Sequence, residues 1–206
     1  MKRKYFLIPG LIFLITLTAV LVYENFNRKK LPYQPLLDRS GAISTTSEWK
    51  NTKAAIIGLQ DQIRRKPDDL KAKLMLALAY MQEARITGEH PYYYPAALDL
   101  IEQILGKDPD DLTIKYEAIV AKSSVLLSLH HFEEARKTGK EALAINRQNA
   151  SIYGILCDAN VELGQYDTAV AMADKMVSIR PDIRSYARVS YLREIYGDMP
   201  GAIRTR

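Results

Sequence analysis

Cysteine is almost missing from this chain, since Cys157 is the one cysteine in 206 residues. A single cysteine cannot form an internal disulfide, and it excludes a zinc site built on several thiolates. Ten glycines and nine prolines are too few for a collagen-like or low-complexity chain. The length, with 48% hydrophobic residues, suits one ordinary folded domain.

Excess positive charge is missing from most of the chain, although the net charge is +5. Residues 1–30 carry six basic side chains and one acid, Glu24, whereas residues 31–206 carry 23 basic and 23 acidic side chains. A nucleic-acid-binding domain concentrates basic residues on its folded part. We therefore expect no nucleic-acid partner.

Catalytic signatures are missing as well. The sequence has no glycine-rich phosphate loop, no H-E-x-x-H, no C-x-x-C and no G-x-S-x-G. His130 and His131 are adjacent, so on a helix they would diverge by about 100° and could not hold one ion together. The chain is predicted to be no enzyme, with no catalytic residue, metal ligand, cofactor or small-molecule substrate.

One long uncharged run stands near the start of the chain. Residues 5–23 read YFLIPGLIFLITLTAVLVY, and nineteen helical residues cover about 28 Å, close to the hydrocarbon thickness of a bilayer. A cleaved signal peptide is the competing interpretation, but its apolar core is usually 7–15 residues long and no A-x-A site follows here. We predict a short basic segment at 1–4 and a transmembrane signal anchor at 5–23.

Basic residues flank this run on both sides, so they determine its orientation only weakly. They are Lys2, Arg3 and Lys4 before it and Arg28, Lys29 and Lys30 after it. The positive-inside rule slightly favours a single-pass protein with a cytoplasmic N-terminus and an extracytoplasmic domain in a bacterial periplasm. An organelle outer-membrane anchor with a cytosolic domain remains an alternative.

After the anchor, residues 24–46 are predicted to be a linker because prolines, Gly41 and a serine–threonine cluster interrupt any periodicity. From residue 47 onward helical periodicity prevails, and alanines recur with spacings of 42, 38, 34 and 33 residues. These alanines are Ala55, Ala97, Ala135, Ala169 and Ala202. A small residue precedes each of the last three by twelve positions, and these residues are Ser123, Cys157 and Ser190.

The segment 150–181, ASIYGILCDANVELGQYDTAVAMADKMVSIRP, resembles a tetratricopeptide repeat. The matching positions are Tyr153, Leu156, Cys157, Gly164, Tyr166, Ala169 and Pro181. The resemblance implies an all-α, right-handed α-solenoid of helical hairpins over residues 47–206, with an apparently incomplete last repeat. It also implies close helix crossings at small residues, which are Ala77, Ser123, Cys157 and Ser190 on first helices and Ala97, Ala135, Ala169 and Ala202 on second helices.

Two regions are predicted to contact protein partners. Residues 85–95, RITGEHPYYYP, are expected to form an inserted loop that presents Tyr92, Tyr93 and Tyr94, since tyrosine is common in binding patches. The alternative is that two of these tyrosines pack on neighbouring helices. The second region is the inner groove that first helices form in the tetratricopeptide family. By register its positions are Leu74, Leu78, Val120, Ser124, Gly154, Asp158, Ala187 and Tyr191.

The sequence therefore predicts a membrane-tethered, non-catalytic scaffold or adaptor that binds partner proteins. Two alternatives stay open. One is a cytosol-facing receptor or chaperone-handover component on an organelle membrane, and the other is the scaffold part of a longer enzyme.

Overall fold

The computed structural model describes residues 16–18 and 33–205. Its contacts divide the chain into two units, Met1–Thr46 and Ser47–Arg206. Within these described ranges, no helix has both the length and the apolar character needed to span a bilayer. Most of the predicted anchor at 5–23 lies outside the described residues, as does much of the predicted linker. The linker prediction missed one element in the first unit, because Gly41–Thr45 form a short 3-10 helix.

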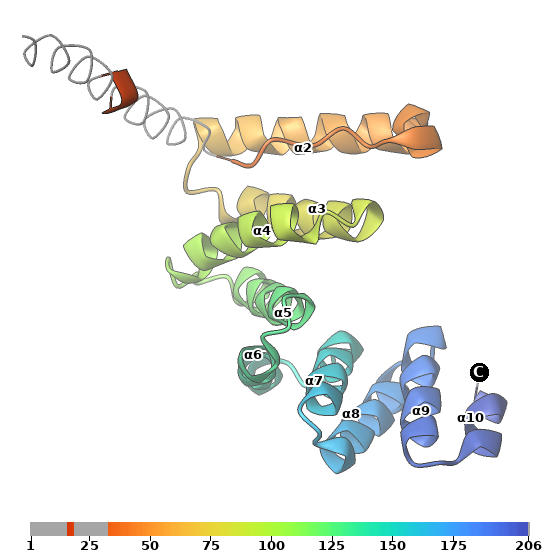
Figure 1. Cartoon of the computed structure of the whole chain (residues 1–206). Helices are drawn as coiled ribbons and strands as arrows, with labels where there is room; N and C mark the ends of the chain where they lie inside the picture. The colour runs from red at the N-terminus through yellow and green to blue at the C-terminus, as the bar shows by residue number, and fades with distance from the viewer. Residues whose placement is uncertain (1–15, 19–32, 206) are drawn as a thin grey trace, which may run out of the picture. The chain divides into compact units, whose positions relative to one another are not determined.

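In the described part of the second unit, residues 47–205, all regular secondary structure is helical, and short turns connect the helices. Its helices are α2 (Ser47–Arg65), α3 (Leu70–Thr87), α4 (His90–Leu105), α5 (Leu112–Ser128), α6 (Phe132–Ile145), α7 (Ala150–Glu162), α8 (Tyr166–Ile179), α9 (Ile183–Ile195) and α10 (Met199–Thr205). Figure 1 shows them as successive hairpins in one stack. The all-α, hairpin-stacked architecture predicted from the repeat spacing is confirmed.

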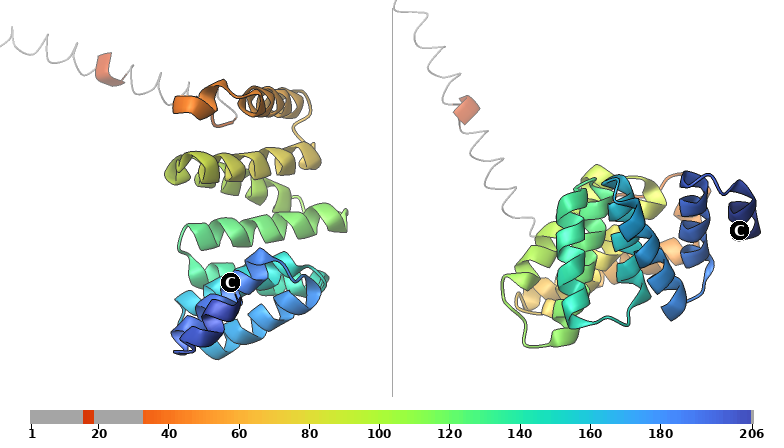
Figure 2. Two further views of the ribbon diagram at one scale, coloured as in Figure 1. Left: turned by 90° about the vertical axis from the view of Figure 1, so that its right-hand side faces the viewer. Right: turned by 90° about the horizontal axis from the view of Figure 1, so that it is seen from below.

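Consecutive helices pair as α3–α4, α5–α6, α7–α8 and α9–α10, and α2 packs alone against α3. The first helix of each hairpin also contacts the first helix of the next, in the series α3, α5, α7 and α9. Second helices make no such contacts with one another in the described residues. The first helices α3, α5, α7 and α9 therefore follow one another along the stack, which Figure 2 shows from two further directions.

Local sequence signals explain where these helices begin and end. The side chains of Asp69, Asp111, Asn149 and Asp182 each accept a hydrogen bond from a backbone amide in the first turn of α3, α5, α7 and α9, respectively. Such capping satisfies amide groups that have no partner inside the helix. Gly88 follows α3 with a φ of 79°, a left-handed conformation that glycine adopts without the strain of a side chain.

The inserted loop predicted at 85–95 is wrong. α3 continues to Thr87, and α4 begins at His90, so the extra residues lengthen both helices to 18 and 16 residues. By comparison, α7 and α8 have 13 and 14 residues. Pro91 stands at the start of α4, where a missing amide proton costs little, and Pro95 is accommodated inside the helix.

Candidate functional site

The three consecutive tyrosines lie on α4, and the structure contradicts their prediction as a partner-binding loop. Tyr93 and Tyr94 are buried, with 0% and 2% of their surface exposed, and Tyr92 is half-buried. The Tyr93 ring stacks on Tyr80 of α3 with centroids 5.8 Å apart. These side chains belong to the core of the first hairpin, so Tyr93 and Tyr94 are not available to a partner.

The small residues of the repeat lie where the two helices of each hairpin meet. All eight are buried, at no more than 2% exposed: Ala77, Ser123, Cys157, Ser190, Ala97, Ala135, Ala169 and Ala202. The Ser123 hydroxyl donates to the Ala135 carbonyl at 2.7 Å, and Ser190 donates to the Ala202 carbonyl at 3.0 Å. A side chain at this position therefore reaches the backbone of the paired helix.

Cys157 takes the same position in the third hairpin, where it packs in an apolar cluster with Ala169, Ala173 and Leu192. Burial raises the pKa of its thiol to about 12, and the nearby Asp158 carboxylate adds to this effect. A thiol with so high a pKa carries almost no thiolate at neutral pH, so it is a poor nucleophile.

The surface formed by the first helices contains some, but not all, of the predicted groove positions. Leu78 on α3 and Tyr191 on α9 are 41% and 54% exposed, so both can contact a partner. Val120, Ser124 and Asp158 are half-buried, and Ala187 is exposed. Leu74 and Gly154 are buried, which removes them from any contact surface.

A charged pair connects two neighbouring first helices, α7 and α9, on this surface. Arg188 on α9 makes a two-point ion pair with Asp158 on α7, with its Nε 2.8 Å from Oδ1 and its Nη2 2.5 Å from Oδ2. Burial alone would lower the pKa of Arg188, but the hydrogen bond and charge of Asp158 outweigh it, so the pKa is raised. Arg188, Asp158 and Tyr191 help to line a small hollow of about 100 Å³ between α7 and α9.

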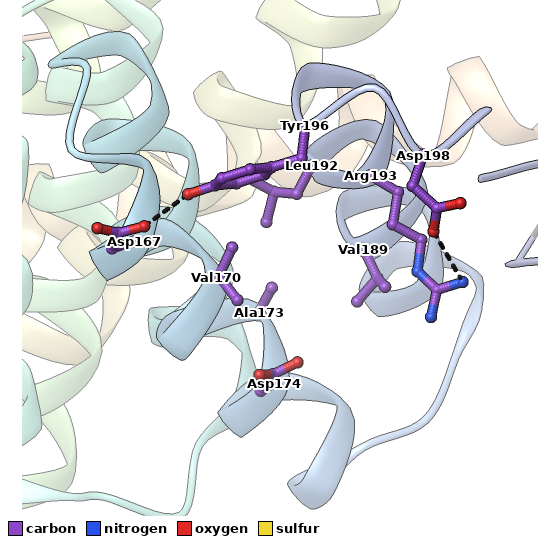
Figure 3. Close-up of a pocket in the computed structure, with 9 residues that line it drawn as sticks. All are labelled: Asp167, Val170, Ala173, Asp174, Val189, Leu192, Arg193, Tyr196 and Asp198. Atoms are coloured by element: carbon purple, nitrogen blue, oxygen red, sulfur yellow. Dashed lines mark hydrogen bonds and ion pairs between the residues drawn. The ribbon is translucent and has the colours of Figure 1, made fainter. Parts of the chain in front are cut away.

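A larger groove, of about 480 Å³, lies between α8 and α9 (Figure 3). Its apolar lining consists of Val170, Ala173, Val189 and Leu192. Three carboxylates also line the groove, from Asp167, Asp174 and Asp198. The one basic group in its lining is the guanidinium of Arg193. The groove is therefore apolar at its base and net negative at its edge.

Two of these carboxylates already have partners. Asp167 accepts a hydrogen bond of 2.6 Å from the Tyr196 hydroxyl, and this bond raises the pKa of Tyr196 (Figure 3). Asp198 accepts from the Gly201 amide and lies 3.9 Å from Arg193. Asp174 has no hydrogen-bond or ion-pair partner within the part of the chain that the structure describes, and it is exposed.

This groove was not predicted from the sequence, although a signal for it was present. In the repeat register, Ala169 of the third hairpin is equivalent to Ala135 of the second. By the same offset of 34 residues, Val170 is equivalent to Arg136 and Asp174 to Lys140. The third hairpin thus has an apolar and an acidic residue where the second has two basic ones. Comparison of exposed positions between repeats would have revealed this difference.

Comparisons with known proteins agree with this geometry. A family model described as tetratricopeptide repeat matches residues 126–194, and no curated protein matches the chain. A crystal structure of MamA is similar over 81% of this chain and 91% of its own, with 20% identity and a TM-score of 0.61. A second structure, MamA from residue 41 to the end from Desulfovibrio magneticus RS-1, covers 75% of this chain and 81% of its own, with 17% identity and a TM-score of 0.60.

The fold is a tetratricopeptide-type α-solenoid. Identities near 20% establish the fold alone, and the family match spans α6 to α9 with the end of α5. Such helical repeats are typical of protein-interaction scaffolds, because a stack of hairpins exposes an extended surface rather than an enclosed pocket. In this chain the four contacting first helices and the groove between α8 and α9 are parts of that exposed surface.

Proposed function

We propose that this protein is a non-catalytic, membrane-tethered scaffold whose α-solenoid holds partner proteins on the surface of its first helices. The observation that carries the proposal is the unbroken contact series from α3 through α5 and α7 to α9. This series forms one surface from four hairpins, and exposed apolar side chains such as Met75, Leu78 and Tyr191 lie on its helices. A partner helix or peptide that buries these side chains gains hydrophobic free energy along its whole length.

The membrane part of the proposal rests on the sequence of residues 5–23, which is uncharged and long enough to span a bilayer. We propose a cytoplasmic N-terminus and a repeat unit on the extracytoplasmic side. Extraction of membranes with alkaline carbonate tests the anchor, because an integral protein stays in the pellet. Added protease tests the side, because an extracytoplasmic unit is digested once the outer barrier is opened, while the inner membrane is still intact.

Partner binding is tested with a photo-crosslinking amino acid placed on the full chain at Leu78 or at Tyr191. Ile145 supplies a matched control, because it is 41% exposed, as is Leu78, but lies on the second helix α6. The proposal expects defined crosslinked adducts at Leu78 and Tyr191 and few at Ile145. Equal labelling at all three positions, or no adduct at either test position, contradicts it.

A further inference from the structure

The groove between α8 and α9 differs from its counterpart one repeat earlier, between α6 and α7. There, Leu156 fits so closely against Gly139 that a Cβ atom on that glycine would lie 2.8 Å from the leucine Cδ2. The repeat register replaces this pair by Val189 and Ala173. Alanine and valine together carry as many side-chain carbon atoms as glycine and leucine, but the α8–α9 boundary has the 480 Å³ groove at this place.

The charge on the second helix changes sign at the same boundary. α6 carries Arg136 and Lys140 at the positions where α8 carries Val170 and Asp174. Arg136 is paired with Glu133 at 2.6 Å on its own helix. The α8–α9 groove is therefore a local feature of this sequence rather than a general result of the repeat. It combines an apolar base with the Asp174 carboxylate, which has no partner among residues 16–18 and 33–205.

The spacing of these groups defines the shape of a ligand. Asp167, Val170 and Asp174 stand on one face of α8, since positions three, four and seven apart share a side of a helix. Asp174 lies four positions after Val170, which is about 6 Å along the helix axis. In an extended peptide, alternate side chains point the same way and are about 6.6 Å apart.

We propose that this groove binds an extended segment of a partner protein, with an apolar side chain on Val170 and Val189 and a lysine or arginine two residues away against Asp174. The proposal rests on the scaffold function and names the chemistry of one of its partners. The three carboxylates and one guanidinium give the groove a net negative charge that favours a basic segment. The apolar base supplies affinity through burial, while Asp174 supplies selection for charge.

Selection from a random peptide library tests the proposal without knowledge of the partner. Dodecapeptides displayed on phage are selected on the full chain held in a mild detergent, and the enriched peptides are sequenced. We expect them to share a lysine or arginine two positions from an aliphatic or aromatic residue. Enriched peptides without a basic residue, or a failure to enrich any peptide, overturn the proposal.

Three variants then locate the binding. Asp174→Lys reverses the unpaired charge and should weaken an enriched peptide at least tenfold. Glu141→Lys makes the same charge change at an exposed position of α6 and should leave binding unchanged. Val189→Leu restores the larger side chain of the preceding repeat and should weaken binding without any change of charge. Equal binding by Asp174→Lys and the unchanged chain overturns the proposal, and melting curves verify that all variants fold.

Crosslinked capture from the native membrane separates this proposal from the scaffold function. If the unchanged chain and Asp174→Lys capture the same partners in equal amounts, the scaffold function stands and the groove proposal fails. If the unchanged chain captures no partner at all, the scaffold function fails and the groove proposal falls with it. Loss of one partner in Asp174→Lys, with the others retained, supports both.

Discussion

Arg188 on α9 holds Asp158 on α7 through two parallel hydrogen bonds that cross from one hairpin to the next. The guanidinium lies over Gly154, where a Cβ atom would come within 3.2 Å of its Cζ. Gly154 has no side chain and thus leaves space for the guanidinium of Arg188. Arg188 in turn neutralises the carboxylate of Asp158, which was predicted to lie in the inner groove of the first helices. This pair shows how the first-helix surface is stabilised between repeats.

Removal of this ion pair should lower stability by a modest amount. Asp158→Ala and Arg188→Ala should each reduce the free energy of unfolding by about 1 kcal/mol, because both side chains are partly exposed and solvent screens the pair. In a double-mutant cycle the coupling energy should be about 1 kcal/mol. Urea unfolding measures these values, and strictly additive effects would show that the pair contributes nothing.

Two glycines within helices should respond to alanine in opposite ways. Gly58→Ala in α2 should stabilise the protein by about 0.5–1 kcal/mol, because the new Cβ meets no atom within 4 Å and alanine favours the helix. Gly139→Ala should destabilise it, because overpacking against Leu156 costs about 1–3 kcal/mol and exceeds the gain in helix propensity. Thermal melting compares the two, and a stabilising Gly139→Ala would contradict the close approach of α6 and α7.

The serine hydroxyls at the helix crossings should contribute one buried hydrogen bond each. Ser123→Ala should lower the free energy of unfolding by about 1 kcal/mol, because the Ala135 carbonyl loses its side-chain donor. Ser190→Ala removes the equivalent bond between α9 and the seven-residue α10. We expect its effect mainly in faster amide exchange of α10, since among the described helices α10 contacts only α9. Unchanged exchange in α10 would contradict this.

Cys157 should be almost unreactive while the protein is folded. Its pKa of about 12 reduces the thiolate fraction at pH 8 by about a thousandfold relative to an unperturbed thiol, and burial adds a steric barrier. Ellman's reagent should therefore react slowly with the native chain and rapidly in concentrated urea. Cys157→Ser provides the background rate. Equal rates in both conditions would place the thiol on the surface.

The cap of α9 should make stability depend on pH in the acid range. Backbone hydrogen bonds from Ser185 and Arg184 lower the pKa of Asp182 below its unfolded value. Its contribution is therefore present above the unfolded pKa, near pH 4, and is lost as the pH falls through the folded pKa. The difference in melting temperature between the unchanged chain and Asp182→Ala should be constant near neutral pH and shrink below about pH 4. A difference that grows in acid would contradict the capping role.

Short-range pattern predicted much of the architecture because each repeat is a local unit. The twelve-residue spacing between a small residue and an alanine places both where two helices of one hairpin cross, as the contact of Ser123 with Ala135 shows. Such a contact depends on helix geometry and a short turn, and both are encoded by neighbouring residues. The helical conformation of residues 90–95 was missed because Gly88 and Pro91 are typical of a loop, although proline is also tolerated at a helix start, whereas burial of two of the tyrosines is the alternative that the sequence left open.

The sequence by itself determined the helical hairpins, their period and the small residues at their crossings, since these depend on interactions within about forty residues. Tertiary structure alone decided which exposed side chains share a surface and where two hairpins stand apart. The α8–α9 groove lies beside Ala173 and Val189, which together carry as many side-chain carbon atoms as Gly139 and Leu156 in the preceding repeat, so it depends on how one hairpin packs against the next. Such an exchange leaves the hydrophobic pattern and the number of apolar carbon atoms unchanged, yet the packing of two helices determines whether the space between them is filled or open.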